Sequence, residues 1–214
     1  MRFPHVVVAT VFAAFSLVSL ALPSSAMAST LAAGAQEFIQ SIADETVGVL
    51  QDDALQIEDR TQKLGSLFNR HFAVEDIARF VLGRHWRSAS EAERSNYVDL
   101  FRDFIVFGYA QRFGDFAGEQ LRVRGASPVD ESTAIVNSEI VRSRQQGNIR
   151  VDWRVVETNG TFQIHDVVVE GVSMAQTQRS DFAATIRQRG SVAGLNQALQ
   201  QKVNQLREQL GIRS

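Results

Sequence analysis

The sequence predicts an α+β fold in which helices precede and follow one antiparallel sheet. Apolar residues recur at helical spacing before about residue 113 and after Ser173, whereas between these segments polarity alternates in four short runs separated by turn residues. Strands joined by short turns pair antiparallel, and helices grouped outside the strands distinguish α+β from α/β. The chain contains no fixed-period repeat and no long linker, so we expect a single domain with one shared core.

The first 28 residues have the pattern of a secretory signal peptide. Arg2 supplies a positive start, Val6–Leu22 is uncharged and apolar, and Ala26-Met27-Ala28 is a small-residue processing site. The alternative is a retained membrane anchor, because this apolar run reaches the lower limit for a spanning helix. We predict cleavage after Ala28, which leaves an exported domain at residues 29–214.

Four helices are expected before the strands. Helical spacing of apolar residues predicts helices over about residues 32–50, 57–69 and 74–82, the last ending at Gly83. Ser90 and Glu93 then form a capping box that starts a long helix over about residues 91–113.

Four strands follow, centred on residues 121–123, 135–141, 151–155 and 162–169. Asn159-Gly160 is the strongest hairpin signal, because both residues tolerate positive φ. After the strands, Ser173 caps a helix that runs to about Arg189, and Gly190 separates it from a last helix over about residues 192–210.

Composition excludes several classes of protein. Of the 214 residues, 44% are hydrophobic, which is too many for a disordered chain, and none is Cys. A chain without Cys has no disulfide scaffold, thiolate-bound metal or cysteine nucleophile. The net charge of −2 provides no basic footprint for nucleic acid, so we expect no nucleic-acid partner.

The search for catalytic chemistry favours a protein that is not an enzyme. His71, His85 and His165 have no metal-ligand spacing, so no metal is expected. Gly171–Ala175 has the context of a nucleophile elbow around Ser173, but no His follows to complete a triad, and a helix cap explains the same serine. Neither a P-loop nor a Rossmann glycine pattern is present, so we also expect no nucleotide cofactor.

One helix carries more apolar surface than a single packed face needs. Phe104–Ala110 is seven residues without a polar break, so apolar groups point in every direction around the axis. Residues 77–82 and Val167–Val169 show the same excess. Two interpretations stay open at this point: a helix enclosed in the centre of the core, or the wall of a ligand cavity.

Two blocks of the sequence resemble the MlaC family, also called the toluene-tolerance auxiliary family. The first block is Leu82–Ser90, continued by Glu93, Arg94, Tyr97, Phe101 and Tyr109-Ala110. The second and more specific block is Val151–Arg154 with Asp166–Met174, continued by Thr177, Arg179, Phe182 and Ile186. The resemblance covers about residues 32–199; His85 stands where the family often has an aromatic residue, and Gly190-Ser191 where relatives often have two glycines.

The resemblance implies a periplasmic phospholipid carrier of Gram-negative bacteria. Such proteins bind lipid non-covalently and shuttle it between an outer-membrane lipoprotein–porin complex and an inner-membrane ABC transporter with an MCE-domain subunit, which maintains outer-membrane lipid asymmetry. The implied fold is a curved, here four-stranded, antiparallel sheet with helices from both ends of the chain on its concave face. Acyl chains lie between them in an apolar cavity, and the cargo is the only bound molecule.

On this interpretation the apolar segments above become candidates for contact with lipid tails. They are Ile77, Phe80, Val81, Phe101, Phe104, Ile105, Tyr109, Val151, Trp153, Val167, Val169, Val172, Met174, Phe182 and Ile186. For the headgroup phosphate the candidate is Arg150, which lies on the opposite strand face just past a turn. Two alternatives remain: a carrier of a hopanoid-like polycyclic lipid, and a non-lipid periplasmic adaptor domain with a fully packed core.

Overall fold

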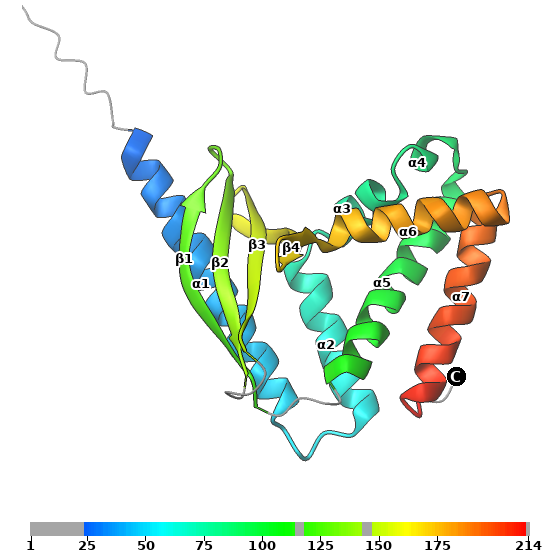
Figure 1. Ribbon diagram of the computed structural model, residues 1–214, viewed down its shortest axis with the longest axis horizontal. Coiled ribbons are helices and arrows are strands. Elements are labelled where there is room, and N and C mark those ends of the chain that lie inside the picture. The colour runs from blue at the N-terminus through cyan, green and yellow to red at the C-terminus, as the bar shows by residue number, and fades with distance from the viewer. Residues whose placement is uncertain (1–23, 114–117, 143–146, 213–214) are drawn as a thin grey trace, which may run out of the picture.

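The computed structural model describes residues 24–113, 118–142 and 147–212 and confirms the α+β class (Figure 1). Its helices are α1 (Ser24–Leu50), α2 (Ile57–His71), α3 (Val74–Leu82), α4 (His85–Ser88), α5 (Glu91–Phe113), α6 (Met174–Arg189) and α7 (Val192–Gln209). Its strands are β1 (Gln120–Pro128), β2 (Thr133–Val141), β3 (Ile149–Thr158), β4 (Thr161–Val169) and β5 (Val172–Ser173). Among the helices so described, none is long and apolar enough to cross a bilayer.

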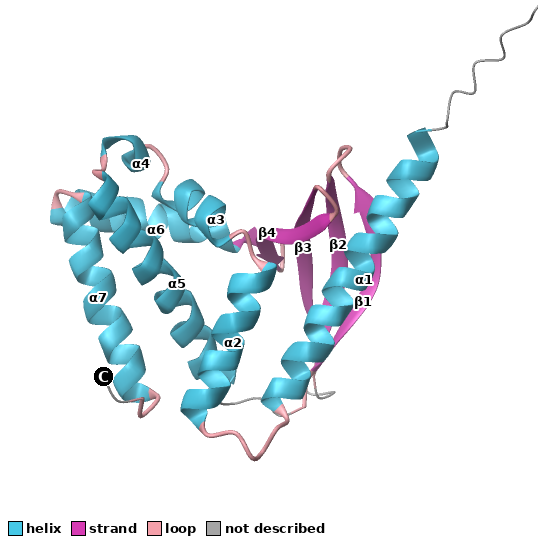
Figure 2. Cartoon of the chain, turned by 180° about the vertical axis from the view of Figure 1, so that it is seen from behind, coloured by secondary structure: helices cyan, strands magenta, loops and turns pink. Residues whose placement is uncertain are grey.

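The five strands form one open antiparallel sheet in the order β1-β2-β3-β4-β5. The hairpin predicted at Asn159-Gly160 is confirmed, since these two residues have φ of 52° and 80° and join β3 to β4. The register shifts between Arg154 and Val155, where β4 carries the extra residue His165. A bulge of this kind bends and twists the strand, and the sheet curves around α1 in both views (Figures 1 and 2).

The helix ends confirm the capping chemistry read from the sequence. The backbone N–H of Glu93 donates to Ser90 Oγ at 3.2 Å, and the Glu93 carboxylate accepts from the backbone N–H of Ser90 at 2.8 Å. Ser173 Oγ accepts from the backbone N–H of Gln176 at 3.0 Å, and Gly190 ends α6 with φ of 85°. These local interactions set the starts of α5 and α6 and the end of α6.

Three elements differ from the prediction. The sheet has five strands, not four, because Val172–Ser173 pairs with Val168 and Val169. Two residues are too short to show an alternating pattern, so only the tertiary pairing reveals β5. The short helix α4 was missed for the same reason of length. The first helix begins at Ser24, inside the predicted signal peptide, and cleavage after Ala28 stays a prediction.

The buried residues form two hydrophobic clusters instead of the single core expected. The sheet cluster packs α1 against the inner face of the sheet; its fully buried members include Ala35, Ile39, Val155 and Ile164. The helical cluster is built from α3, α5, α6 and α7 around Tyr97, Phe101 and Phe182. From the carboxyl end of the chain, α6 also reaches β4, whereas α7 packs on α5 and α6. The two clusters therefore lie side by side (Figure 1).

Candidate functional site

A cavity of about 760 Å³ lies between the two clusters. Eight of the twelve elements, together with Phe72 between α2 and α3, contribute to its wall. The apolar wall consists of Ile42, Leu64, Leu67, Phe68, Phe72, Ile77, Val81, Phe101, Phe104, Ile105, Val106, Tyr109, Phe113, Trp153, Val167, Met174, Ala175 and Leu206. The polar side chains on the wall are Thr46, Gln111, Arg112, Asp166, Thr177, Gln178, Asp181 and Lys202. A predominantly apolar cavity with a few polar groups is typical of a binding site for a hydrophobic ligand.

Helix α5 accounts for the apolar run that the sequence left unexplained. Phe104, Ile105 and Tyr109 face the cavity, whereas Ala110 is buried and Phe107 lies under the Arg207 guanidinium at 5.7 Å. One helix thus serves as packed core on one side and as cavity wall on another. The apolar run is therefore covered by protein on one side and faces the cavity on another.

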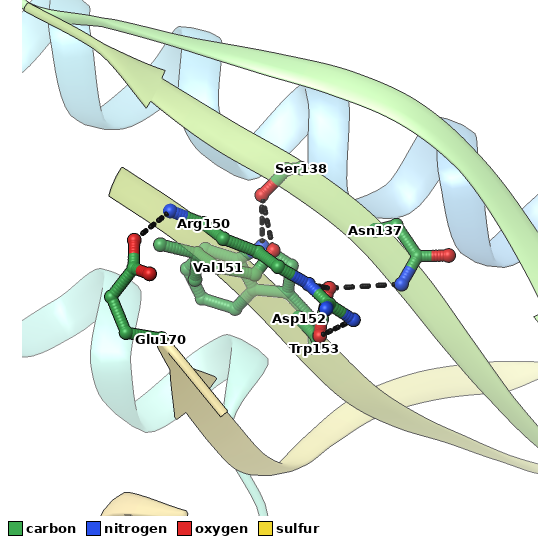
Figure 3. A network of polar contacts seen from close by, with 7 residues as sticks. All are labelled: Asn137, Ser138, Arg150, Val151, Asp152, Trp153 and Glu170. Carbon is green, nitrogen blue, oxygen red and sulfur yellow. Dashed lines mark hydrogen bonds and ion pairs between the residues drawn. The ribbon is translucent and has the colours of Figure 1, made fainter. Parts of the chain in front are cut away.

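The sheet contributes Trp153 and Val167, which pair across β3 and β4. The Trp153 indole Nε1–H donates to Ser138 Oγ at 2.9 Å, and Ser138 Oγ–H donates to the Val151 carbonyl at 2.8 Å (Figure 3). Ser138 is buried, so this chain of hydrogen bonds satisfies both polar groups and holds the indole in one orientation. Ser138 was not predicted as part of the site. Its place among apolar residues on the inner face of β2 indicates a buried hydroxyl that needs a hydrogen-bond partner.

Helix α2 forms a wall that the sequence analysis did not identify. Leu64, Leu67 and Phe68 line the cavity. Gly65 lets α2 pack closely on α5, because a Cβ at this position would lie 3.4 Å from the Val106 side chain. The apolar stripe of α2 was visible in the sequence. A stripe that faces a cavity has the same spacing as one that faces a packed core, so spacing alone could not select it.

Nine of the fifteen predicted tail-contact residues line the cavity. They are Ile77, Val81, Phe101, Phe104, Ile105, Tyr109, Trp153, Val167 and Met174. The other six do not: they are Phe80, Val151, Val169, Val172, Phe182 and Ile186.

The six residues lie in three different environments, two in each. Phe182 and Ile186 are buried inside the helical cluster. Val151 and Val169 share the inner sheet face with Trp153 by alternation but lie beyond the cavity. Phe80 and Val172 are 45% and 52% exposed. The helical and strand periods placed these side chains on an apolar face without distinguishing core, cavity and surface.

Arg150, the predicted headgroup residue, lies away from the cavity. Its side chain is 64% exposed on the outer face of the sheet, and its Nη2 lies 2.6 Å from Asp152 Oδ2 (Figure 3). Asn137 Nδ2–H also donates to Asp152 at 2.8 Å, so the carboxylate has two partners. Two cations that the sequence analysis missed, Arg112 of α5 and Lys202 of α7, lie on the cavity wall instead.

The carboxylate of Asp166 organises the junction between β4 and α6 at the cavity wall. It accepts hydrogen bonds from the Ser173 hydroxyl at 2.6 Å and from the backbone N–H groups of Val167 and Ala175 at 2.9 and 3.1 Å. Ser173 therefore serves as a hydrogen-bonded helix cap. Within the described ranges, no group of three His, Cys, Asp or Glu side chains is placed to hold a metal ion.

Tyr109 marks the rim where the cavity meets solvent. It is 38% exposed, and the Arg112 guanidinium lies over its ring at 5.4 Å. Desolvation raises the pKa of the Tyr109 phenol, and the Arg112 charge opposes that shift, so the ring carries a neutral hydroxyl at neutral pH.

The comparisons with known proteins agree with this architecture. A family model described as MlaC protein matches residues 40–201, which is most of the chain. The chain belongs to the MlaC family. A curated member, the intermembrane phospholipid transport system binding protein MlaC of Haemophilus influenzae, is 20% identical over 185 residues, covering 82% of this chain and 86% of its own.

A solved structure shares the MlaC fold seen here. The phospholipid-binding protein of Ralstonia solanacearum, determined in complex with a phospholipid, superposes with a TM-score of 0.70 at 20% identity. The match covers 80% of this chain and 98% of that one. The α+β arrangement of a sheet beside a helical cluster is therefore shared across nearly the whole of that protein.

Proposed function

We propose that this MlaC-family chain is a non-covalent phospholipid carrier whose acyl chains occupy the cavity between the two clusters. The observation that carries the proposal is the apolar cavity of about 760 Å³. Membership of the family, a relative named as the binding protein of a phospholipid transport system, and a fold shared with a phospholipid complex all support it.

The size of the cavity suits hydrocarbon chains. A cavity of about 150 Å³ holds one benzene ring, so on that scale this cavity accepts about five rings, or about 30 carbon atoms. That amount of hydrocarbon corresponds to two acyl chains of ordinary length. Exposing about 30 methylenes to water costs on the order of 24 kcal/mol, which is the reason a lipid needs a carrier to cross an aqueous compartment.

The headgroup phosphate lies near Arg112 and Lys202 in this proposal, and not near Arg150. Both are exposed cations on the cavity wall, Arg112 beside the rim residue Tyr109. A charged phosphate stays in water at such a rim at little cost, while the tails leave water. Arg112 presents several N–H donors in a planar fork that suits phosphate oxygens.

The wider role follows from the family. The carrier works in the periplasm after removal of residues 1–28, and it moves phospholipid between an outer-membrane lipoprotein–porin complex and an inner-membrane ABC transporter with an MCE-domain subunit. This traffic maintains the lipid asymmetry of the outer membrane. Transfer needs no covalent chemistry, because lipid enters and leaves when the two clusters separate, and the chain acts without an enzymatic step.

Lipid retention by cavity variants tests the proposal. Phe104→Glu places a carboxylate on the cavity wall, and we expect loss of nearly all co-purifying phospholipid, measured by organic extraction and mass spectrometry. Val129→Glu is the control, since Val129 is an exposed apolar residue between β1 and β2, away from the cavity wall. Ile105→Trp reduces the cavity without adding charge and should also lower the lipid content, which covers the case in which Phe104→Glu folds poorly.

The outcomes separate the alternatives. Undiminished phospholipid in both cavity variants would contradict the assignment of the cavity. A polycyclic lipid in the extract of the unaltered protein would identify the hopanoid-type carrier. Absence of any lipid from stable protein purified from its native periplasm would favour the adaptor domain.

A further inference from the structure

Seven arginines gather at one end of the helical cluster. Arg79 lies on α3, Arg84 and Arg87 lie at α4, and Arg94 lies on the first turns of α5. Arg179, Arg187 and Arg189 lie on α6. The elements α3, α4, α6 and the start of α5 occupy the same end of the molecule in both views (Figures 1 and 2). We call this surface the arginine face.

None of these seven arginines forms an ion pair with a carboxylate in the part of the chain that the structure describes. The sheet differs, because Arg122 and Arg124 both pair with Glu139. Acidic residues near the arginine face lie mostly in the first turns of α3 and α5, where the helix dipole offsets their charge. Glu93 is additionally bound in the Ser90 capping box. The guanidinium groups therefore remain available to an external anion.

Aromatic and apolar side chains lie among the arginines. The Arg94 guanidinium lies over the Trp86 ring at 5.7 Å, and that of Arg179 lies over the exposed Phe80 ring at 4.9 Å. Gly83 has a φ of 60° and no side chain, so Arg179 can approach it closely. A Cβ at this position would lie 3.1 Å from Arg179 Nη2. Such amphipathic rings beside cations suit the headgroup level of a bilayer, where one side of a side chain is apolar and the other is polar.

An acidic stretch lies at the opposite end of the molecule. Residues 44–59, which form the end of α1, the turn and the start of α2, contain six carboxylates and no Lys or Arg. This stretch lies at the far end of the molecule from α4 (Figure 1). The carboxylates of this stretch therefore lie far from the arginine face (Figure 1) and do not neutralise it.

We infer that the arginine face docks the protein on a bilayer surface rich in anionic phospholipid headgroups. Arginine binds phosphate oxygens through paired N–H groups, and the exposed Phe80 beside Arg179 adds apolar contact on the same face. Phe80 lies on α3 between the cavity-wall residues Ile77 and Val81, so the docked face adjoins the cavity. The inference concerns an external surface and does not depend on what fills the cavity.

Sedimentation with vesicles tests the docking surface. The purified protein should bind vesicles of phosphatidylcholine mixed with phosphatidylglycerol and not vesicles of phosphatidylcholine alone. Binding should disappear in about 1 M salt, where charges are screened within about 3 Å. Each basic residue near an anionic bilayer strengthens binding about fivefold, so the double variant Arg84→Gln with Arg87→Gln should bind about 25-fold more weakly.

The matched control is Arg122→Gln with Arg154→Gln, which removes the same charge from the outer face of the sheet. Equal losses in the two double variants would show that net charge and not the arginine face governs binding, and would overturn the inference. Failure of the unaltered protein to prefer anionic vesicles would overturn it as well, including the case in which it binds an acidic polypeptide instead. The lipid content of the Arg84→Gln, Arg87→Gln protein, measured by extraction, reports separately on the cavity.

Discussion

The two hydrophobic clusters are built from different kinds of residue. The helical cluster is aromatic, with the rings of Tyr97, Phe101 and Phe182 meeting at centroid distances of 6.0 to 6.3 Å. In the sheet cluster, small and branched side chains such as Ala35 and Ala134 let α1 lie close against the strands. Gly34 is part of this approach, because a Cβ there would lie 2.8 Å from the Phe162 ring.

The cavity lies where neither cluster is closed. Phe104 and Ile105 are partly buried members of the helical cluster, Trp153 and Val167 are partly buried members of the sheet cluster, and all four line the cavity. The comparison teaches that the buried interiors of the two clusters provide stability, whereas their partly buried edges supply much of the cavity wall. Substitutions in a closed interior should therefore cost folding free energy, and substitutions at the edge should cost ligand.

The largest effect on stability is expected from Phe182→Ala, which opens the helical cluster. Phe182 is buried and contacts the rings of Tyr97, Phe101 and Phe104. Removing a buried phenyl ring lowers the free energy of unfolding by about 3–5 kcal/mol, which urea denaturation followed by circular dichroism would measure. Phe80→Ala, at an exposed position of the same residue type, should cost less than about 1 kcal/mol. Similar losses in both variants would contradict the division between interior and surface.

An intermediate effect is expected from Tyr97→Phe. The Tyr97 hydroxyl donates to the Ala78 carbonyl at 3.0 Å in the helical cluster, so its removal should cost about 1 kcal/mol at neutral pH. Burial also raises the pKa of Tyr97 well above its usual value of about 10. Above pH about 10 the unfolded chain loses this proton while the folded chain keeps it, so the stability of the unaltered protein falls as the pH rises.

Tyr97→Phe should remove most of this alkaline decline. Tyr109 is the only other tyrosine of the sequence, so Tyr109→Phe is the natural control. Tyr109 is partly exposed at the cavity rim, and we expect it to change the decline less. An unchanged alkaline decline in Tyr97→Phe would rule out this residue as the source.

The smallest effect concerns the sheet cluster and acid pH. His71 lies edge-on to Phe38 at a ring distance of 5.6 Å. Burial lowers the pKa of His71, the Arg70 charge adds to the shift and the Glu45 carboxylate opposes it; burial also lowers the pKa of His165. Below pH about 6.5 the unfolded chain binds protons that the folded chain accepts only at lower pH, so stability falls as the pH falls.

His71→Gln should reduce the free energy of unfolding that is lost on acidification by less than about 1 kcal/mol. Combining it with His165→Gln should reduce this loss further. Thermal unfolding between pH 5 and pH 7 would measure both (about the range in which histidine titrates). An acid decline that is equally steep in the double variant would assign it to carboxylates. Together with the tyrosine variants, this experiment separates acid sensitivity near the sheet cluster from alkaline sensitivity in the helical cluster.

Local sequence determined most of the secondary structure. The bounds predicted for the helices at residues 74–82 and 91–113 agree with α3 and α5, and the hairpin at Asn159-Gly160 agrees with the turn between β3 and β4. These features depend on neighbours a few residues apart: capping hydroxyls, glycines that accept positive φ, and apolar periods of two or 3.6 residues. Such interactions are already present in the linear chain.

The tertiary structure alone decided which apolar and basic residues line the cavity. Phe104 and Phe182 have the same chemistry and both lie on apolar helix faces, yet one lines the cavity and the other closes the helical cluster. The sequence pointed to Arg150 and not to Arg112, yet β3 directs Arg150 toward Asp152, whereas α5 brings Arg112 to the cavity wall. A periodic pattern predicts that one face of a helix or strand is shielded from water, but it does not identify what shields it. Protein side chains and a hydrocarbon ligand exclude water from such a face equally well.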